Sequence, residues 1–296
     1  MSNGIQMREN EHNSIIMLAA QRELYSEAKK LCNVDVVISV GLPILLAIMQ
    51  SVYDEKNWII PFISALIIAS IILGIVLTNI VKKKKEVAAT IQQLFDVYVF
   101  QLPWDSKLFG RYYSLSNEII IYSKKIIRNT SDEMQFVNWY TPIADQLPLL
   151  KGITVCQAEN CQWDKSLRMR YKNTASFCIT MISIIIIGIG IINNQSVQLV
   201  FLRLATIIPM IRWLAFLVNN LKHDILRLEI LEKDFSMESE KNMDDVLNVQ
   251  KSIFEHRKDA ELIPNVVYRL FTKKDEQRAR EIASLRRDTI NKRNNS

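Results

Sequence analysis

Long windows without a charged residue constrain the fold of this chain more than any other feature. Three such windows, 36–53, 58–81 and 173–202, hold about 18, 24 and 30 residues, and a helix needs about 20 apolar residues to cross a hydrocarbon core. A further apolar stretch, "VFLRLATIIPMIRWLAFLV", follows the third window and contains two arginines. We therefore predict four transmembrane helices, over 34–53, 58–81, 175–193 and 197–218.

Positive charges predict the orientation of these helices. "VKKKKE" follows the second predicted span, "KSLRMRYK" precedes the third and "LKHDILR" follows the fourth, whereas the links within each pair of spans are short and carry little charge. Lysine and arginine near span ends are retained in the cytoplasm, so both termini are expected there. The predicted class is mainly α, a polytopic membrane protein with four transmembrane helices in two hairpins. Its expected parts are an N-terminal cytoplasmic amphipathic helix (1–33), hairpin 1 (34–81), a mostly helical central cytoplasmic region (82–174), hairpin 2 (175–218) and a C-terminal cytoplasmic helical tail (219–296).

Apolar residues repeat at helical spacing outside the predicted spans as well. The N-terminal stripe needs a partner helix or the membrane surface, and Asn13 or Ser14 is its expected cap. A second stripe extends the helix of the second span as far as Pro103, and a third predicts a helix that stops near Pro264. Residues 119–122 fit a short strand or a helix equally well. The three stripes are Met17, Ala20, Leu24, Ala28 and Leu31; Val87, Ile91, Leu94 and Tyr98; and Val246, Val249 and Ile253.

The sequence has none of the common catalytic motifs. It lacks a Walker-type loop, a GxSxG elbow and an HExxH motif, and it has only seven glycines for phosphate-cradling loops. Four scattered cysteines and three histidines do not have the spacing of a zinc site. We therefore expect free thiols in a reducing compartment, no metal, no cofactor and no enzymatic activity.

The segment "CQAENCQWDKSLRMRYK" (156–172) combines cations and aromatics just before the third span. It fits a juxtamembrane helix whose cations meet lipid headgroups and whose aromatics lie at the interface. It also fits a nucleotide site in which cations take phosphates and an aromatic ring stacks on a base. The cations in residues 124–128 could make a second phosphate contact, or they could simply form a solvated face of the protein. The candidate ligand residues are Lys165, Arg168, Arg170, Trp163, Trp104, Tyr112, Lys124, Lys125 and Arg128.

The two arginines of the fourth span have different expected roles. Arg203 lies near the outer interface, and its side chain reaches outward along the direction in which helical side chains lean. Arg212 would have to reach against that direction, and a charge within the membrane costs about 2.5–3.5 kcal/mol on insertion scales. We expect Arg212 to face the bundle, a neighbouring subunit or water, with Asp35 as its candidate partner.

Five motifs in order resemble one protein family. They are "LAAQRELYSEAK" (18–29), "LFDVYVFQLPW" (94–104), "NWY" (138–140) with "QLPL" (146–149), "CQWDKSLRMRY" (161–171) and "IFEHRKDAELIPNVVYRLF" (253–271). Together with the predicted spans, they resemble the SMODS-associating four-transmembrane effectors of CBASS-type bacterial anti-phage signalling. The resemblance covers nearly the whole chain.

The resemblance implies a function in the bacterial inner membrane. Such an effector is encoded beside a nucleotidyltransferase that makes a cyclic di- or oligonucleotide, senses that second messenger in the cytoplasm and damages the inner membrane, so that the infected cell stops growing or dies. Expected partners are the messenger, membrane lipids and further copies of the chain in a homo-oligomer, with no DNA or RNA polymer. The alternative is a membrane-anchored adaptor or scaffold that recruits a protein partner without permeation.

Overall fold

The computed structural model of the protein describes residues 2–42, 59–192, 196–235, 241–268 and 270. This part of the chain is mainly α-helical and contains no β-strand, which confirms the predicted helical class. Its elements in chain order are α1 (Ile5–Glu9), α2 (His12–Val36), η1 (Val37–Gly41), α4 (Ile59–Phe100), α5 (Ser106–Phe109), η2 (Tyr112–Leu115), α6 (Ser116–Ile126), α7 (Thr130–Glu133), η3 (Met134–Phe136), η4 (Pro142–Gln146), α8 (Leu149–Ile192), α9 (Val197–Lys233) and α10 (Met243–Asp259).

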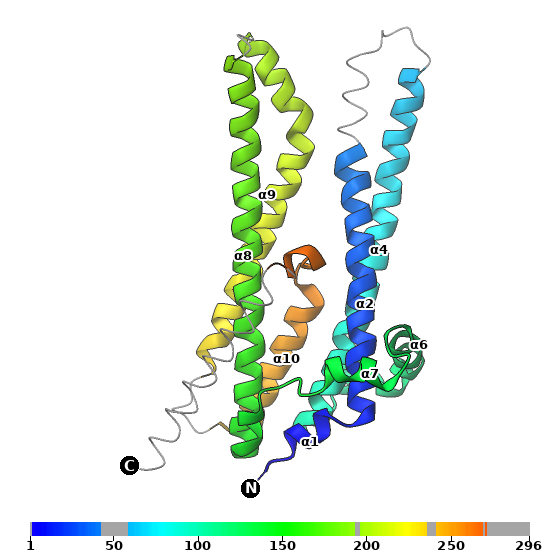
Figure 1. The fold of residues 1–296 in the computed structure, drawn as a ribbon, viewed down its shortest axis with the longest axis vertical. Coiled ribbons are helices and arrows are strands. Elements are labelled where there is room, and N and C mark those ends of the chain that lie inside the picture. The colour runs from blue at the N-terminus through cyan, green and yellow to red at the C-terminus, as the bar shows by residue number, and fades with distance from the viewer. Residues whose placement is uncertain (1, 43–58, 193–195, 236–240, 269, 271–296) are drawn as a thin grey trace.

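Two long helical hairpins stand side by side (Figure 1). α2 packs along α4 in one hairpin, and α8 packs along α9 in the other. α10 lies between the two hairpins in the lower half of the molecule and contacts α4, α8 and α9, while α1, α6 and α7 lie around the lower end of the first hairpin. The molecule therefore consists of two long hairpins, here called the arms, which are joined in their lower halves.

The long helices continue through the boundaries between the predicted regions. α4 runs from Ile59 through the four-lysine run to Phe100, and Gln101, with a φ of 56°, ends it just before Pro103. α8 begins after Pro148 and is continuous to Ile192. The predicted continuation of α4 toward Pro103 is confirmed, and residues 119–122 are helical within α6.

The predicted cap of the N-terminal helix, Asn13 or Ser14, is wrong by two to three residues. α2 begins at His12, with Glu11 as the N-cap residue in an extended conformation. Ser14 lies inside the helix and its hydroxyl donates to the carbonyl oxygen of Arg8 at 2.6 Å, so it ties α2 to α1 instead of capping α2. Four of the five stripe residues are buried, and α4 is the partner helix that the stripe required.

The largest core lies in the lower half, where α1, α2, α4, α6 and α8 meet. Leu18, Leu24 and Phe95 are at most 2% exposed. Tyr140 packs against the rings of Phe95 and Phe100, with ring centroids 6.0 and 5.1 Å apart. This core fixes the lower ends of the hairpins and so holds the polar residues described below in register.

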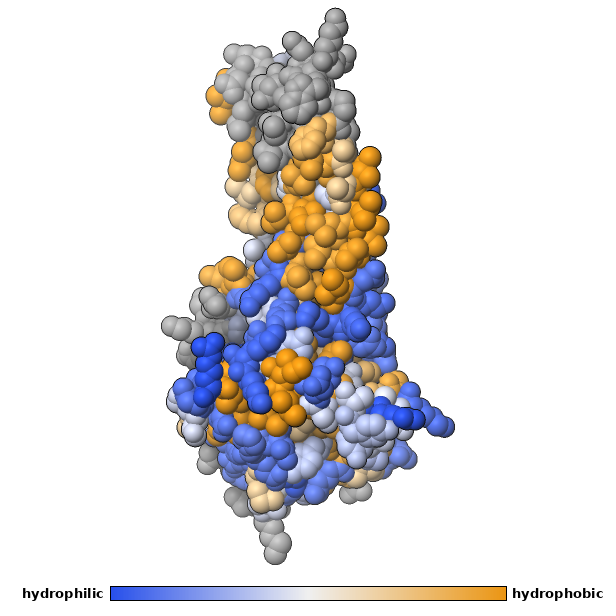
Figure 2. All heavy atoms as spheres, turned by 90° about the vertical axis from the view of Figure 1, so that its right-hand side faces the viewer, coloured by the Kyte–Doolittle hydropathy of each residue, from blue (hydrophilic) through white to orange (hydrophobic). Residues whose placement is uncertain are grey.

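On the face shown in Figure 2, the coloured upper part of the molecule is mainly apolar, whereas the lower part is mainly hydrophilic with a smaller apolar patch. Large apolar side chains are exposed along α4, α8 and α9. Across the part of the chain that the structure describes, no helix has both the length and the apolar character needed to cross a membrane. The four spans stay a prediction, and their residues 43–53, 58 and 193 lie outside the described residues. The exposed residues include Phe62, Ile68, Ile72 and Ile75 on α4, Phe177, Ile184, Ile191 and Ile192 on α8, and Ile208 and Phe216 on α9.

Replacing a core leucine of α2 should destabilise the lower half. Leu24→Ala removes a side chain that is 2% exposed, and the resulting cavity should lower the free energy of unfolding by about 2–5 kcal/mol. Chemical unfolding in detergent micelles, followed by circular dichroism, measures this. Met7→Ala is the control, because Met7 is 66% exposed; equal stabilities of the two variants would contradict the packing of α2 on α4.

Candidate functional site

α10 brings polar residues from both hairpins together. Asn242 and Asp245 form a capping box at its start, and its buried residues Val246, Val249 and Ile253 are the stripe predicted from the sequence. The helix ends at Asp259, near a segment in which His256, Arg257 and Glu261 contact different helices. We name the segment 256–261 with its polar partners the α10 junction.

Arg257 ties α10 to the first hairpin. Its Nη1 donates to Oδ2 of Asp96 on α4 at 2.5 Å, and Asp96 is only 1% exposed. Tyr140 and Gln250 also donate to this carboxylate, at 2.5 and 2.9 Å. Three donors thus compensate for the burial of Asp96, which would otherwise be costly.

His256 ties α10 to the second hairpin. Its Nε2 lies 2.8 Å from Oδ2 of Asp164 on α8. The same oxygen accepts from Nε of Arg168 at 3.0 Å, and Nη1 of Arg168 donates to Asp224 on α9 at 2.7 Å. Burial alone would raise the pKa of Asp164, but the Arg168 guanidinium and His256 outweigh burial and hold that pKa well below its ordinary value.

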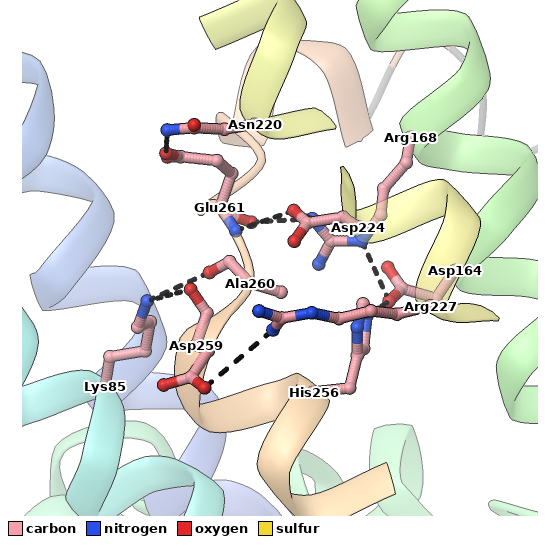
Figure 3. Close-up of polar contacts among 10 residues, drawn as sticks. All are labelled: Lys85, Asp164, Arg168, Asn220, Asp224, Arg227, His256, Asp259, Ala260 and Glu261. Atoms are coloured by element: carbon pink, nitrogen blue, oxygen red, sulfur yellow. Dashed lines mark hydrogen bonds and ion pairs between the residues drawn. The ribbon is translucent and has the colours of Figure 1, made fainter. Parts of the chain in front are cut away.

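The backbone after α10 completes the junction (Figure 3). The Glu261 N–H donates to Asp224 at 2.9 Å, and the Glu261 carbonyl accepts from Arg168 at 3.0 Å. Asn220 donates to the Glu261 carboxylate at 2.6 Å. Lys85 of α4 donates to the carbonyl oxygens of Asp259 and Ala260, at 3.0 and 2.9 Å. A segment of six residues therefore binds α4, α8 and α9 at once (Figure 3).

The polar contacts of this junction connect helices of the two hairpins. His256 and Arg257 are neighbours in sequence, yet each binds a carboxylate from a different hairpin. Truncating one partner of such a buried pair leaves the other charge uncompensated. The arrangement can therefore link the position of one hairpin to that of the other.

The structure places two of the three predicted phosphate ligands of α8, Lys165 and Arg168, against protein carboxylates. Lys165 forms an ion pair with Glu232 on α9. Arg168 is 6% exposed and holds Asp164 and Asp224, while Arg170 is half-buried. Their contact with a ligand stays a prediction, and Arg168 would have to leave two carboxylates to make it.

The predicted stacking aromatics lie in separate places. Trp163 packs against Tyr268, with ring centroids 5.4 Å apart. The Trp104 indole N–H donates to the Gly110 carbonyl at 2.8 Å, and its ring packs against Phe109. Tyr112 is 57% exposed. Within the described residues, no ring contact or hydrogen bond brings Trp163 together with Trp104 or Tyr112.

The remaining candidates are more exposed. Lys124 and Arg128 lie at the surface, and Lys125 pairs with Glu27. Arg212 is exposed on α9 and Asp35 is half-buried; their pairing stays a prediction. Arg203 belongs to α9, and its side chain lies outside the described residues, as does the whole of the segment 271–296. The four cysteines are free thiols, as predicted, and no cluster of metal-ligating side chains occurs in the described part of the chain.

Sequence reasoning overlooked the partners of Arg168 and of Arg257. One signal was present: Asp164 and Arg168 are four residues apart on one helix, the spacing of an intrahelical ion pair. A second was the position of His256, three residues after Ile253 on the apolar stripe, which places it on the buried face of α10. No local signal identified Asp96 or Asp224 as partners, because they lie 161 and 56 residues from the arginines they bind.

Comparison with known proteins gives the class of the chain. The model of the SMODS-associating 4TM effector domain matches residues 3–284, so the chain belongs to this family. A protein from Bacillus cereus (strain VD146) described as a probable CBASS effector molecule is 24% identical over 291 residues, covering 93% of this chain and 95% of that protein. No solved structure matches the chain at a significant level. Membership supports an anti-phage effector role and a link to cyclic nucleotide signalling.

Removing the Arg168 guanidinium should strongly destabilise the junction. Arg168→Met keeps similar volume but leaves two carboxylates without their cation, and breaking a buried pair costs about 3–5 kcal/mol. Unfolding in detergent measures the loss. Arg227→Met is the matched control, since Arg227 is 52% exposed and lies 3.8 Å from Asp259, so its loss should cost less than about 1 kcal/mol. Similar losses for both variants would argue against a buried network.

A buried carboxyl of α1 should give stability a characteristic pH dependence. Glu9 is 1% exposed and accepts from the Tyr140 N–H at 2.8 Å. Burial, with Asp145 and Glu159 nearby, raises its pKa from 4.5 to about 7. The folded protein therefore holds this proton more tightly than the unfolded chain, and the resulting stability is complete below pH 4.5 and lost as pH rises toward 7.

Glu9→Gln should remove this dependence, because glutamine keeps an acceptor for the Tyr140 N–H and does not titrate. Between pH 4.5 and 7 the wild type should lose stability relative to the variant by up to about 1.4 kcal/mol per pH unit. Unfolding at several pH values tests this. Parallel pH profiles for the two proteins would show that Glu9 titrates normally.

Proposed function

We propose that this chain is an anti-phage membrane effector that senses a cyclic di- or oligonucleotide in the cytoplasm and disrupts the inner membrane, so that the infected cell stops growing or dies. It would act by changing conformation, without catalysis, as a homo-oligomer that works with a messenger-synthesising nucleotidyltransferase. Family membership supports the effector role. The observation that carries the mechanism is that one short segment, 256–261, binds helices of both hairpins.

The apolar upper half supports the membrane part of the proposal. Isoleucines and phenylalanines are exposed along α4, α8 and α9, and the upper part of the face shown in Figure 2 is apolar. Large exposed apolar patches mark surfaces that contact a membrane or another protein. In this proposal the hairpins are two pairs of spans with both termini in the cytoplasm. The junction then lies on the cytoplasmic side, where a soluble messenger has access.

The proposed response is a change in how the two hairpins are held. A ligand shifts a two-state equilibrium only by its differential affinity for the states, and moving it from 1:99 to 99:1 takes about 5.5 kcal/mol. Several charge-assisted hydrogen bonds, worth about 1.5–3 kcal/mol each, would supply that. The α10 junction would pass the shift from the lower half to the apolar arms.

Leakage from liposomes tests the proposal. The full chain is reconstituted with a trapped dye, and cyclic di- and trinucleotides are added in turn. One member of the panel should release the dye, because it alone stabilises the open arrangement of the hairpins. Protein shown to be inserted and folded that stays silent with every nucleotide would favour the scaffold, in which nothing permeates.

Lys85→Gln separates sensing from response. It removes the ammonium that binds the carbonyl oxygens of Asp259 and Ala260, so nucleotide binding should persist while triggered leakage falls several-fold. Lys83→Gln is the control, since Lys83 is an exposed member of the same lysine run. Equal leakage by the two variants would remove the junction from the mechanism.

A further inference from the structure

Two lysines from different helices converge on one glutamate in the lower half. Nζ of Lys84 on α4 lies 2.7 Å from Oε2 of Glu27 on α2, and Nζ of Lys125 on α6 lies 2.5 Å from Oε1. Each carboxylate oxygen thus receives one ammonium group. The neighbouring lysine, Lys85, reaches the α10 junction instead, so the four-lysine run contacts two different sites.

A tyrosine completes this cluster. Nζ of Lys84 lies 5.2 Å from the centroid of the Tyr122 ring and Nζ of Lys125 lies 4.4 Å from it, both in cation–π range. Lys84 also donates to the Tyr122 hydroxyl at 3.0 Å. The tyrosine therefore holds both cations in place independently of Glu27. We call Lys84, Lys125 and Tyr122 the Tyr122 cradle.

The cradle is accessible, unlike the α10 junction. The side chains of Glu27, Lys84 and Lys125 are 23%, 22% and 44% exposed, whereas those of Arg168 and Asp224 are 7% and 8% exposed. Fully exposed ion pairs contribute about 0–1 kcal/mol each, and the partly exposed pairs of Glu27 lie between this limit and the buried Arg168 network. A competing anion can therefore displace Glu27 at lower cost than it can displace the partners of Arg168.

We propose that the Tyr122 cradle is a binding site for a phosphate group, which the Glu27 carboxylate fills when no ligand is bound, and that a phosphodiester of the cyclic nucleotide replaces Glu27. This inference rests on the proposed function for the identity of the ligand. A phosphodiester carries one negative charge and two free oxygens, as a carboxylate does, so it can accept from both ammonium groups. Lysine binds phosphate as a point charge, which suits this exchange.

Displacing Glu27 would free α2 from two of its ties. Glu27 holds α2 to α4 through Lys84 and to α6 through Lys125. α2 leads directly into η1 and the predicted first span. The ligand would thus replace the contacts of Glu27 with Lys84 and Lys125 by its own contacts with these lysines. The released α2 could then move, and its movement would reach the apolar arms.

Nucleotide affinity in Glu27 variants tests this. The full chain in phosphatidylcholine nanodiscs is titrated with cyclic di-AMP, cyclic di-GMP and cyclic tri-AMP by calorimetry. Glu27→Gln removes the competing charge and should tighten binding of the active nucleotide about tenfold, equivalent to about 1.4 kcal/mol. Lys125→Gln should weaken binding about tenfold, and Lys125→Arg should retain it. The two Lys125 variants decide the question if E27Q does not fold.

Two control variants make the same kinds of substitution at ion pairs elsewhere on the surface. Glu232→Gln removes a carboxylate that is 24% exposed and paired with Lys165, and Lys251→Gln removes a lysine that is 40% exposed and paired with Asp105. Neither should alter affinity. A purely structural role for Glu27 predicts that E27Q only lowers stability, without tighter binding.

Each other outcome overturns a different part of the proposal. Unchanged or weaker binding by E27Q, with the wild type binding normally, removes the cradle and leaves the proposed function intact. Tighter binding by E232Q alone moves the site to Lys165. No binding of any nucleotide by the wild type or E27Q overturns the proposed function. If E27Q changes only the retention of phosphatidylglycerol in mixed nanodiscs, the phosphate belongs to a lipid headgroup and the messenger is excluded.

Discussion

Two consecutive residues of α10 hold carboxylates from opposite hairpins, and the arrangement of the molecule depends on this. His256 binds Asp164 and Arg257 binds Asp96. Successive side chains on a helix point about 100° apart, so a helix lying between two arms presents one residue to each. The largest core packs the lower ends of the arms together, and the junction adds directed polar contacts between them.

Buried ionic networks are a weak source of stability, because desolvation offsets much of the attraction. Asp96, Arg168 and Asp224 are each at most 8% exposed, and apolar residues of similar size would pack at least as well. Their value lies in directionality: an ion pair with fixed donors tolerates few alternative registers, whereas apolar surfaces slide. In a protein whose arms are apolar on the outside, polar contacts at the base are the means to specify how the arms meet.

Much of the fold could be predicted from the sequence, since helical periodicity is local. The stripe that includes Leu24 and the stripe from Val246 to Ile253 face the core as expected, and α4 ends where Pro103 requires. The candidate site was harder. Arg168 is of a residue type that binds phosphate well, but in the structure its guanidinium is bound by Asp224 of another helix and by the Glu261 carbonyl. Such pairings are set by tertiary packing, and no spacing along the chain encodes them.

α4 is a single helix of 42 residues, which at 1.5 Å per residue makes it about 63 Å long. A hydrocarbon core is about 30 Å thick, so in the proposed arrangement roughly half of this helix would stand clear of the membrane. Lys84 and Lys85 lie along it, one facing α2 and the other α10. Because both lysines belong to one continuous helix, a rotation of α4 about its axis must disturb both contacts together. α4 therefore couples the two sites mechanically.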